Sequence, residues 1–79
     1  MTISDSALVY NVRETLRKDI RTADQAIDVM TSEGVVLLFG NVDTEEHAVV
    51  ATQLVRGLVG VRDVLDRINR RGEVSEKAA

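Results

Sequence analysis

The sequence contains no cysteine, no proline and no tryptophan, and it has a single histidine, a single tyrosine and a single phenylalanine. Without cysteine, neither a disulfide framework nor a thiolate metal site can form. One imidazole provides little for a histidine metal site, and so few aromatic rings cannot form a stacking platform for single-stranded nucleic acid. A net charge of −3 does not provide the positive charge that phosphate contacts require. We therefore expect no nucleic-acid partner, no metal and no cofactor.

Long apolar runs are also missing. Residues 2–7 have no basic segment followed by an apolar one, which is not typical of a secretory signal, and no run approaches the ~20 residues of a membrane span. As written, the chain is expected to be cytoplasmic, or envelope-associated if a targeting segment has been removed. Its 79 residues, 44% apolar and 29% charged, predict one small globular domain.

Apolar residues recur at three- and four-residue spacing from Asp5 to Arg21, which predicts a helix capped by Ser4 or Asp5. The stripe that this helix would bury consists of Leu8, Val9, Val12, Leu16 and Ile20. Four basic residues lie off the stripe, toward the C-terminal end: Arg13, Arg17, Lys18 and Arg21. They either form a solvated face that complements the helix dipole or contact an anionic surface.

The segment AIDVMTSEGVVLLFGNV predicts a β-hairpin, with a tight turn at SEG in which Gly34 adopts a positive φ. Strict alternation assigns one face to Ile27, Val29, Thr31, Val36, Leu38 and Val42. The other face receives Asp28, Met30, Val35, Leu37 and Phe39. The stretch GVVLLFG is therefore apolar on both faces, which is typical of a central strand.

The segment NVDTEEHAVVATQLVRGLVGV predicts a second helix, with Asp43 as N-cap, Glu46 completing a capping box and Gly60 ending the helix in a left-handed conformation. Its apolar face consists of Ala48, Ala51, Leu54, Val55 and Leu58. VRDVLDRIN predicts a third strand, in which Val64 and Ile68 share a face and Leu65 points the opposite way. We expect residues 1–4 to be an N-terminal extension and residues 70–79 to be a flexible charged tail.

The order helix, strand, strand, helix, strand predicts an α+β fold, αββαβ. A right-handed crossover makes the second and third strands parallel, and the hairpin is antiparallel, which gives a three-stranded mixed sheet. Both helices are expected to pack mainly on one face of the sheet, because Ala48 and Ala51 would allow close packing against Gly40.

This arrangement resembles the BON domain, a bacterial module of osmotic-stress and nodulation-associated proteins. The resemblance lies in SDSALVYNVRETL, in IDVMTSEGVVLLFGNVDTEEH and in GLVGVRDVLDRI. It covers residues 5–69, and its landmarks are Gly34, Val36, Leu38, Gly40, Val42, Gly60, Val61 and Val64. The resemblance implies two helices on one side of a mixed sheet. It also implies a non-enzymatic module that binds phospholipid surfaces or partner proteins, commonly at the cell envelope and in stress responses.

If both helices share one face, five apolar side chains remain on the other: Met30, Val35, Leu37, Phe39 and Leu65. A patch of this kind marks an interaction site. It would be covered by a helix or the tail of the same chain, by a second copy in a homo-oligomer, or by a lipid or a partner protein.

The chemistry of the remaining side chains favours no reaction. His47 follows two glutamates, and such a pair serves metal binding or proton transfer in some proteins, but a boundary histidine is the simpler interpretation. No nucleophile and base occur in a catalytic pattern, so we expect no enzyme. The alternative to an interaction module is a small-ligand or cation sensor, with potassium as the candidate that the resemblance suggests.

Overall fold

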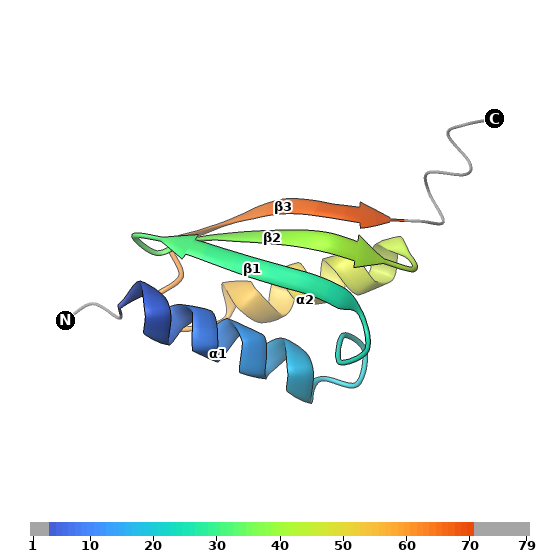
Figure 1. Ribbon diagram of the computed structural model, residues 1–79, viewed down its shortest axis with the longest axis horizontal. Coiled ribbons are helices and arrows are strands. Elements are labelled where there is room, and N and C mark those ends of the chain that lie inside the picture. The colour runs from blue at the N-terminus through green and yellow to red at the C-terminus, as the bar shows by residue number, and fades with distance from the viewer. Residues whose placement is uncertain (1–3, 71–79) are drawn as a thin grey trace.

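The computed structural model describes residues 4–70. Along the chain the elements are α1 (Asp5–Lys18), β1 (Ala26–Ser32), β2 (Val35–Val42), α2 (Glu45–Arg56) and β3 (Asp63–Arg70) (Figure 1). This order confirms the predicted αββαβ arrangement. Nearly all of the predicted N-terminal extension (1–4) and of the predicted charged tail (70–79) lies outside the described residues.

The sheet has the strand order β1-β2-β3. β1 pairs antiparallel with β2, and β2 pairs parallel with β3. The two residues of the hairpin turn, Glu33 and Gly34, have φ angles of 51° and 85°, the positive values that a tight two-residue hairpin needs. The apolar stretch GVVLLFG thus runs along the central strand, as its composition predicts.

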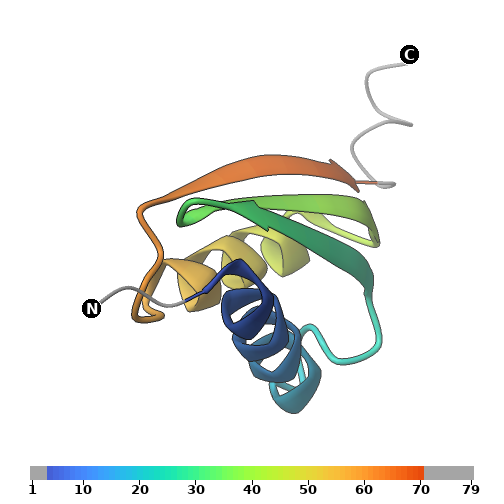
Figure 2. The ribbon, with the colours of Figure 1, turned by 60° about the vertical axis from the view of Figure 1, so that its left-hand side comes forward.

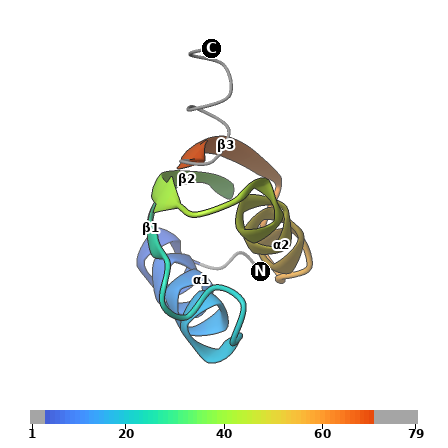
Figure 3. The same ribbon diagram turned by 90° about the vertical axis from the view of Figure 1, so that its right-hand side faces the viewer.

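Both helices lie on the same side of the sheet (Figures 2 and 3). α1 packs against β1, α2 packs against β3 and β2, and the two helices contact each other. The molecule therefore has two layers, one of helices and one of strands. Figure 3 shows that no helix lies on the other side of the sheet in the described chain.

The core between the layers receives side chains from all five elements. Its most deeply buried large members are Leu8, Val12, Val36, Leu38, Val42 and Val55. The predicted inner face of the sheet is confirmed, since Val29, Val64 and Ile68 are also buried. Ala48 and Ala51 are completely buried on α2, where Val50, a residue outside the predicted apolar face, is buried as well.

The end of α1 differs from the prediction. The helix stops at Lys18 rather than at Arg21, and the C-cap residue Asp19 is already extended. Ile20 therefore leaves the apolar stripe and is 88% exposed. Its assignment to the stripe was wrong because the spacing of apolar residues does not show where a helix ends.

A side chain outside the helix fixes this end. The hydroxyl of Thr22 is buried and donates to the carbonyl oxygen of Leu16 at 2.6 Å, which satisfies one of the free carbonyl groups of the last turn. The backbone N–H of Thr22 donates to the carbonyl oxygen of Asp19 at 3.0 Å. These bonds turn the chain toward β1.

Both predicted ends of α2 also need correction. Thr44, not Asp43, is the N-cap, and its hydroxyl is hydrogen-bonded to His47 Nδ1 at 3.0 Å rather than to a backbone N–H of the helix. The helix ends at Arg56, with Gly57 as its C-cap. Gly60 has the predicted positive φ, 96°, but it lies in the loop before β3 and does not end the helix.

Gly40 adopts a conformation that the neighbouring strand makes necessary. Its φ is 126°, and a Cβ atom on it would collide with the carbonyl oxygen of Ala26 on β1. The adjacent strand therefore requires glycine here.

Candidate interaction surface

The outer face of the sheet, defined here as the face turned away from both helices, is organised in rows that run across the three strands. The central row is entirely apolar and consists of Met30, Leu37 and Leu65. The two flanking rows have an apolar residue on β2 and polar residues on the edge strands. One of these rows is Ser32, Val35 and Asp63, and the other is Asp28, Phe39 and Arg67.

The structure brings the five predicted surface residues together in these rows. Met30 is 59% exposed and Leu65 is 41% exposed, whereas the three side chains on the central strand are half-buried among their neighbours. No element of residues 4–70 covers them, so the alternative in which a helix folds across this face is wrong. The alternative in which the tail does so falls on residues 71–79, outside the described residues.

The edge of β3 is occupied by the strand's own side chains. The carboxylate of Asp63 accepts a hydrogen bond from the N–H of Val64 at 2.8 Å, and that of Asp66 accepts one from the N–H of Ile68 at 3.0 Å. Arg70 donates to the carbonyl oxygen of Ile68 at 2.6 Å. These backbone groups are therefore already bonded, which disfavours the addition of another strand here.

The β1 edge is partly occupied, by one of its own carboxylates and by side-chain contacts with α1. The carboxylate of Asp28 accepts from the N–H of Val29 at 2.8 Å and also from Arg13 of α1 at 3.2 Å. The hydroxyl of Thr31 donates to the carbonyl oxygen of Asp5 at 3.0 Å. The outer face, rather than either edge, is thus the open part of the sheet.

The four basic residues predicted to contact an anionic surface are all exposed, but three of them form ion pairs with carboxylates of the domain itself. Besides the pair of Arg13 with Asp28, Arg17 bonds Glu14 at 2.7 Å and Arg21 bonds Asp19 at 2.8 Å. The hydrogen bonds from the Arg21 side chain and backbone lower the pKa of Asp19 to about 2. Lys18 makes no ion pair with another described residue. The anionic-surface contact stays a prediction, and much of the positive charge of these four residues is neutralised by neighbouring carboxylates.

A family model of the BON domain matches residues 4–72, almost the whole chain. The chain belongs to the BON domain family. This confirms the resemblance found in the sequence, and the match includes both helices and all three strands. No curated protein matches the chain. Neither helix of this BON domain is long and apolar enough, within residues 4–70, to cross a bilayer.

Within residues 4–70, no cluster of three or more histidine or acidic side chains is arranged to hold a metal ion. His47 bonds the hydroxyl of Thr44 and lies at the boundary of the core, in agreement with the simpler of its two interpretations. The predicted absence of catalysis is not tested by this arrangement and stays a prediction.

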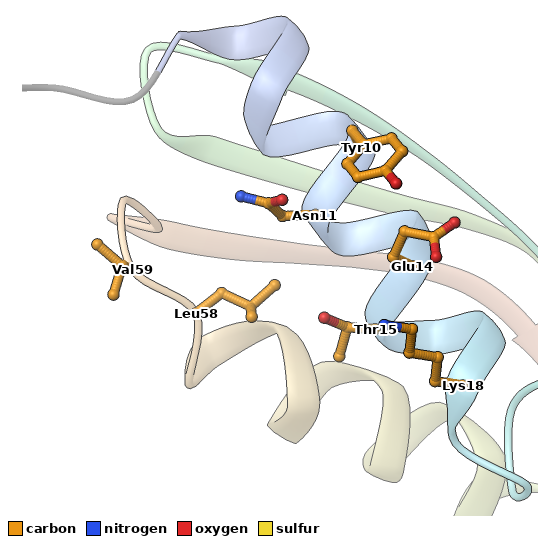
Figure 4. A pocket seen from close by; sticks show the side chains of 7 residues that line it. All are labelled: Tyr10, Asn11, Glu14, Thr15, Lys18, Leu58 and Val59. Carbon is orange, nitrogen blue, oxygen red and sulfur yellow. The ribbon is translucent and has the colours of Figure 1, made fainter.

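An open groove of about 400 Å³ lies between α1 and the loop that follows α2 (Figure 4). Its lining residues are Tyr10, Asn11, Glu14, Thr15, Lys18, Leu58 and Val59. No pattern in the sequence indicates this groove, because it depends on how the two helices sit beside each other. Glu14 at its wall is already bonded to Arg17, and this hydrogen bond lowers the pKa of Glu14. The residues that line the groove are a mixture of polar, charged and apolar side chains, and neither one sign of charge nor apolar groups predominate among them.

Arg70 was also missed, because the prediction assigned it to the charged tail. It is the last residue of β3, and its guanidinium bonds Asp66 at 2.6 Å and Glu45 of α2 at 2.7 Å. Burial raises the pKa of Asp66, but the hydrogen bonds from Arg70 and from the Ile68 N–H outweigh it, so the pKa lies below its usual value. This network ties the start of α2 to the end of β3.

Proposed function

We propose that this BON domain is a non-enzymatic module that binds a partner protein through the outer face of its sheet. One observation carries the proposal: both helices pack on the opposite face, so an apolar row and its flanks are left open on a small domain. The largest apolar patch on the surface of a small protein is often functional. A role in stress or at the envelope belongs to the proposal and rests on the family alone.

The charges around the patch favour a protein over an anionic phospholipid surface. The flanking rows carry two carboxylates, Asp28 and Asp63, and a single guanidinium, Arg67. Anionic headgroups would meet net negative charge at this rim, whereas a protein surface can match both signs. The basic residues of α1, where a headgroup contact was predicted, largely neutralise carboxylates of the domain itself.

The size of the patch sets the strength of binding. Burial of about 150 Å² of apolar surface at ~25 cal/mol per Å² contributes about 4 kcal/mol before the costs of association. This is too little for an obligate complex and suits a contact that forms and separates. We therefore expect an adaptor-like role in which the domain folds alone and binds reversibly.

Site-specific photo-crosslinking in the cell of origin tests the proposal. A photo-reactive phenylalanine derivative in place of Leu37 should give protein adducts. The same probe in place of Val59 should give none, because Val59 is 79% exposed but lies beyond α2, away from the outer face. Protein adducts only from position 59, or lipid adducts alone from position 37, would contradict the proposal.

The two alternatives are tested with the purified chain. Phosphatidylglycerol vesicles should not co-sediment the protein, and potassium chloride should not raise the thermal midpoint above that in sodium chloride of equal concentration. Vesicle binding that Arg17→Gln weakens would favour the phospholipid contact through α1. A potassium-specific rise in the midpoint would favour a sensor.

A further inference from the structure

We propose that the partner on the outer face is a second copy of this chain, placed so that Arg67 of each copy faces Asp63 of the other. The inference rests on the proposed function and deepens it by naming the partner. The two copies would be related by a two-fold axis that runs across the strands along the row of Met30, Leu37 and Leu65.

The register of the strands gives this surface its complementarity. When two identical faces meet, the two-fold axis lies in the plane between them and each residue faces the one at its mirrored position across the axis. An axis along the central row maps that row onto itself and exchanges the flanking rows. Val35 then faces Phe39 of the second copy, and Asp63 faces Arg67. A small side chain meets a large one, and a carboxylate meets a guanidinium.

The two charges that would pair have no ion-pair partner among residues 4–70, although the Asp63 carboxylate also accepts a hydrogen bond from the Val64 N–H. Asp63 and Arg67 lie four residues apart on one strand, about 13 Å in extended chain, so they do not pair within one copy. Neither makes an ion pair with any residue in the range 4–70. Arg67 is exposed, and its row partner Asp28 already binds Arg13 and the N–H of Val29.

The other possible two-fold axis fits less well. An axis along β2 would place Phe39 against Phe39 and Asp63 against Ser32, and it would direct Arg67 to the carboxylate of Asp28 that Arg13 uses. Pairing through a strand edge is also disfavoured, because the backbone groups at the β3 edge are bonded by the strand's own side chains. The axis across the strands is therefore the one that leaves every charged group partnered.

The contact is small. Three rows on three strands cover roughly 300 Å², from a strand spacing of about 4.8 Å and a row spacing of about 6.7 Å. A stable interface needs about 800 Å² on each partner. The dimer is thus expected to form only at high concentration, in the range of ~0.1–1 mM.

Sedimentation equilibrium of the full chain at low salt, up to ~1 mM, tests the inference. The wild type should show a monomer–dimer equilibrium. The single variants Arg67→Glu and Asp63→Arg should each weaken dimerisation about tenfold or more. The reason is that each variant places like charges opposite each other twice per dimer. The double variant Asp63→Arg/Arg67→Glu should restore it, because the pair is re-formed with its charges exchanged. Arg56→Glu, the same charge change on α2, is the matched control and should leave the dimer unchanged.

Circular dichroism confirms that each variant folds. If Asp63→Arg does not fold, the test uses Arg67→Glu and Leu37→Lys instead. Both should dimerise more weakly than the control Arg56→Glu. A chain that stays monomeric at ~1 mM, or an Arg67→Glu variant no weaker than the control, overturns the inference. A double variant that folds but does not recover overturns the pairing of Arg67 with Asp63. Crosslinks from position 37 to a different protein would overturn this inference while the proposed function stands.

Discussion

Replacement of Gly40 by alanine probes the contact that fixes the hairpin. The new Cβ would collide with the backbone carbonyl oxygen of Ala26, and no side-chain rotation can relieve a clash with backbone. A φ of 126° also strains any residue with a side chain. Such strain costs about 1–3 kcal/mol. Moving β1 away to make room sacrifices one or two ladder hydrogen bonds at about 1 kcal/mol each.

The expected loss is thus about 2–5 kcal/mol. A 79-residue domain has only about 4–12 kcal/mol of stability in total. Urea denaturation followed by far-UV circular dichroism measures the change. Gly57→Ala is the matched control, since its φ is −81° and the nearest atom to a new Cβ is 3.6 Å away. That variant should change stability by less than about 1 kcal/mol, with a gain if anything. If Gly40→Ala cost no more than Gly57→Ala, the role assigned to β1 at this position would be refuted.

Three further outcomes are expected. Leu38→Ala in the core should cost about 2–5 kcal/mol in urea denaturation, and Leu65→Ala on the outer face less than about 1 kcal/mol; equal losses would mean that the faces are exchanged. Thr22→Val should cost about 1–3 kcal/mol, because it leaves a buried carbonyl oxygen unpaired, while Thr22→Ser should retain most of the stability. The Asp19 carboxyl signal should titrate near pH 2 in NMR spectra. Its depressed pKa stabilises the fold above the unfolded value of about 3.8, and this contribution disappears as the pH falls toward 2, an effect that Asp19→Asn should abolish.

The alternation of β2 was enough to predict both faces of the sheet, because side chains of a strand point to opposite faces at every second residue. The five surface residues were found for the same reason. The start of α1 at Asp5, with Ser4 as its N-cap, was predicted correctly, because the cap is a contact within the first turn. The end of α1 and both ends of α2 were not, because they depend on side-chain contacts that the apolar spacing does not encode. α1 ends where the Thr22 hydroxyl binds it, and α2 begins where Thr44 binds His47 instead of a backbone N–H.

Local sequence patterns also could not predict which residues of neighbouring strands lie opposite each other. The collision that makes Gly40 necessary involves a residue fourteen positions earlier in the chain, Ala26. The rows that place Asp63 and Arg67 on either side of the central apolar row follow from the register of β2 with β3, which no local spacing encodes. The composition of the surface was therefore predictable, and its arrangement was not.

The occupied edge of β3 limits how large an assembly of this domain can become. Proteins that join edge to edge can add copies without end, because each new copy presents a fresh edge, and fibrils grow in this way. On β3, the carboxylates of Asp63 and Asp66 and the guanidinium of Arg70 occupy backbone groups that such growth would use. Copies that meet through the outer face, as proposed, should therefore form a finite complex rather than a filament.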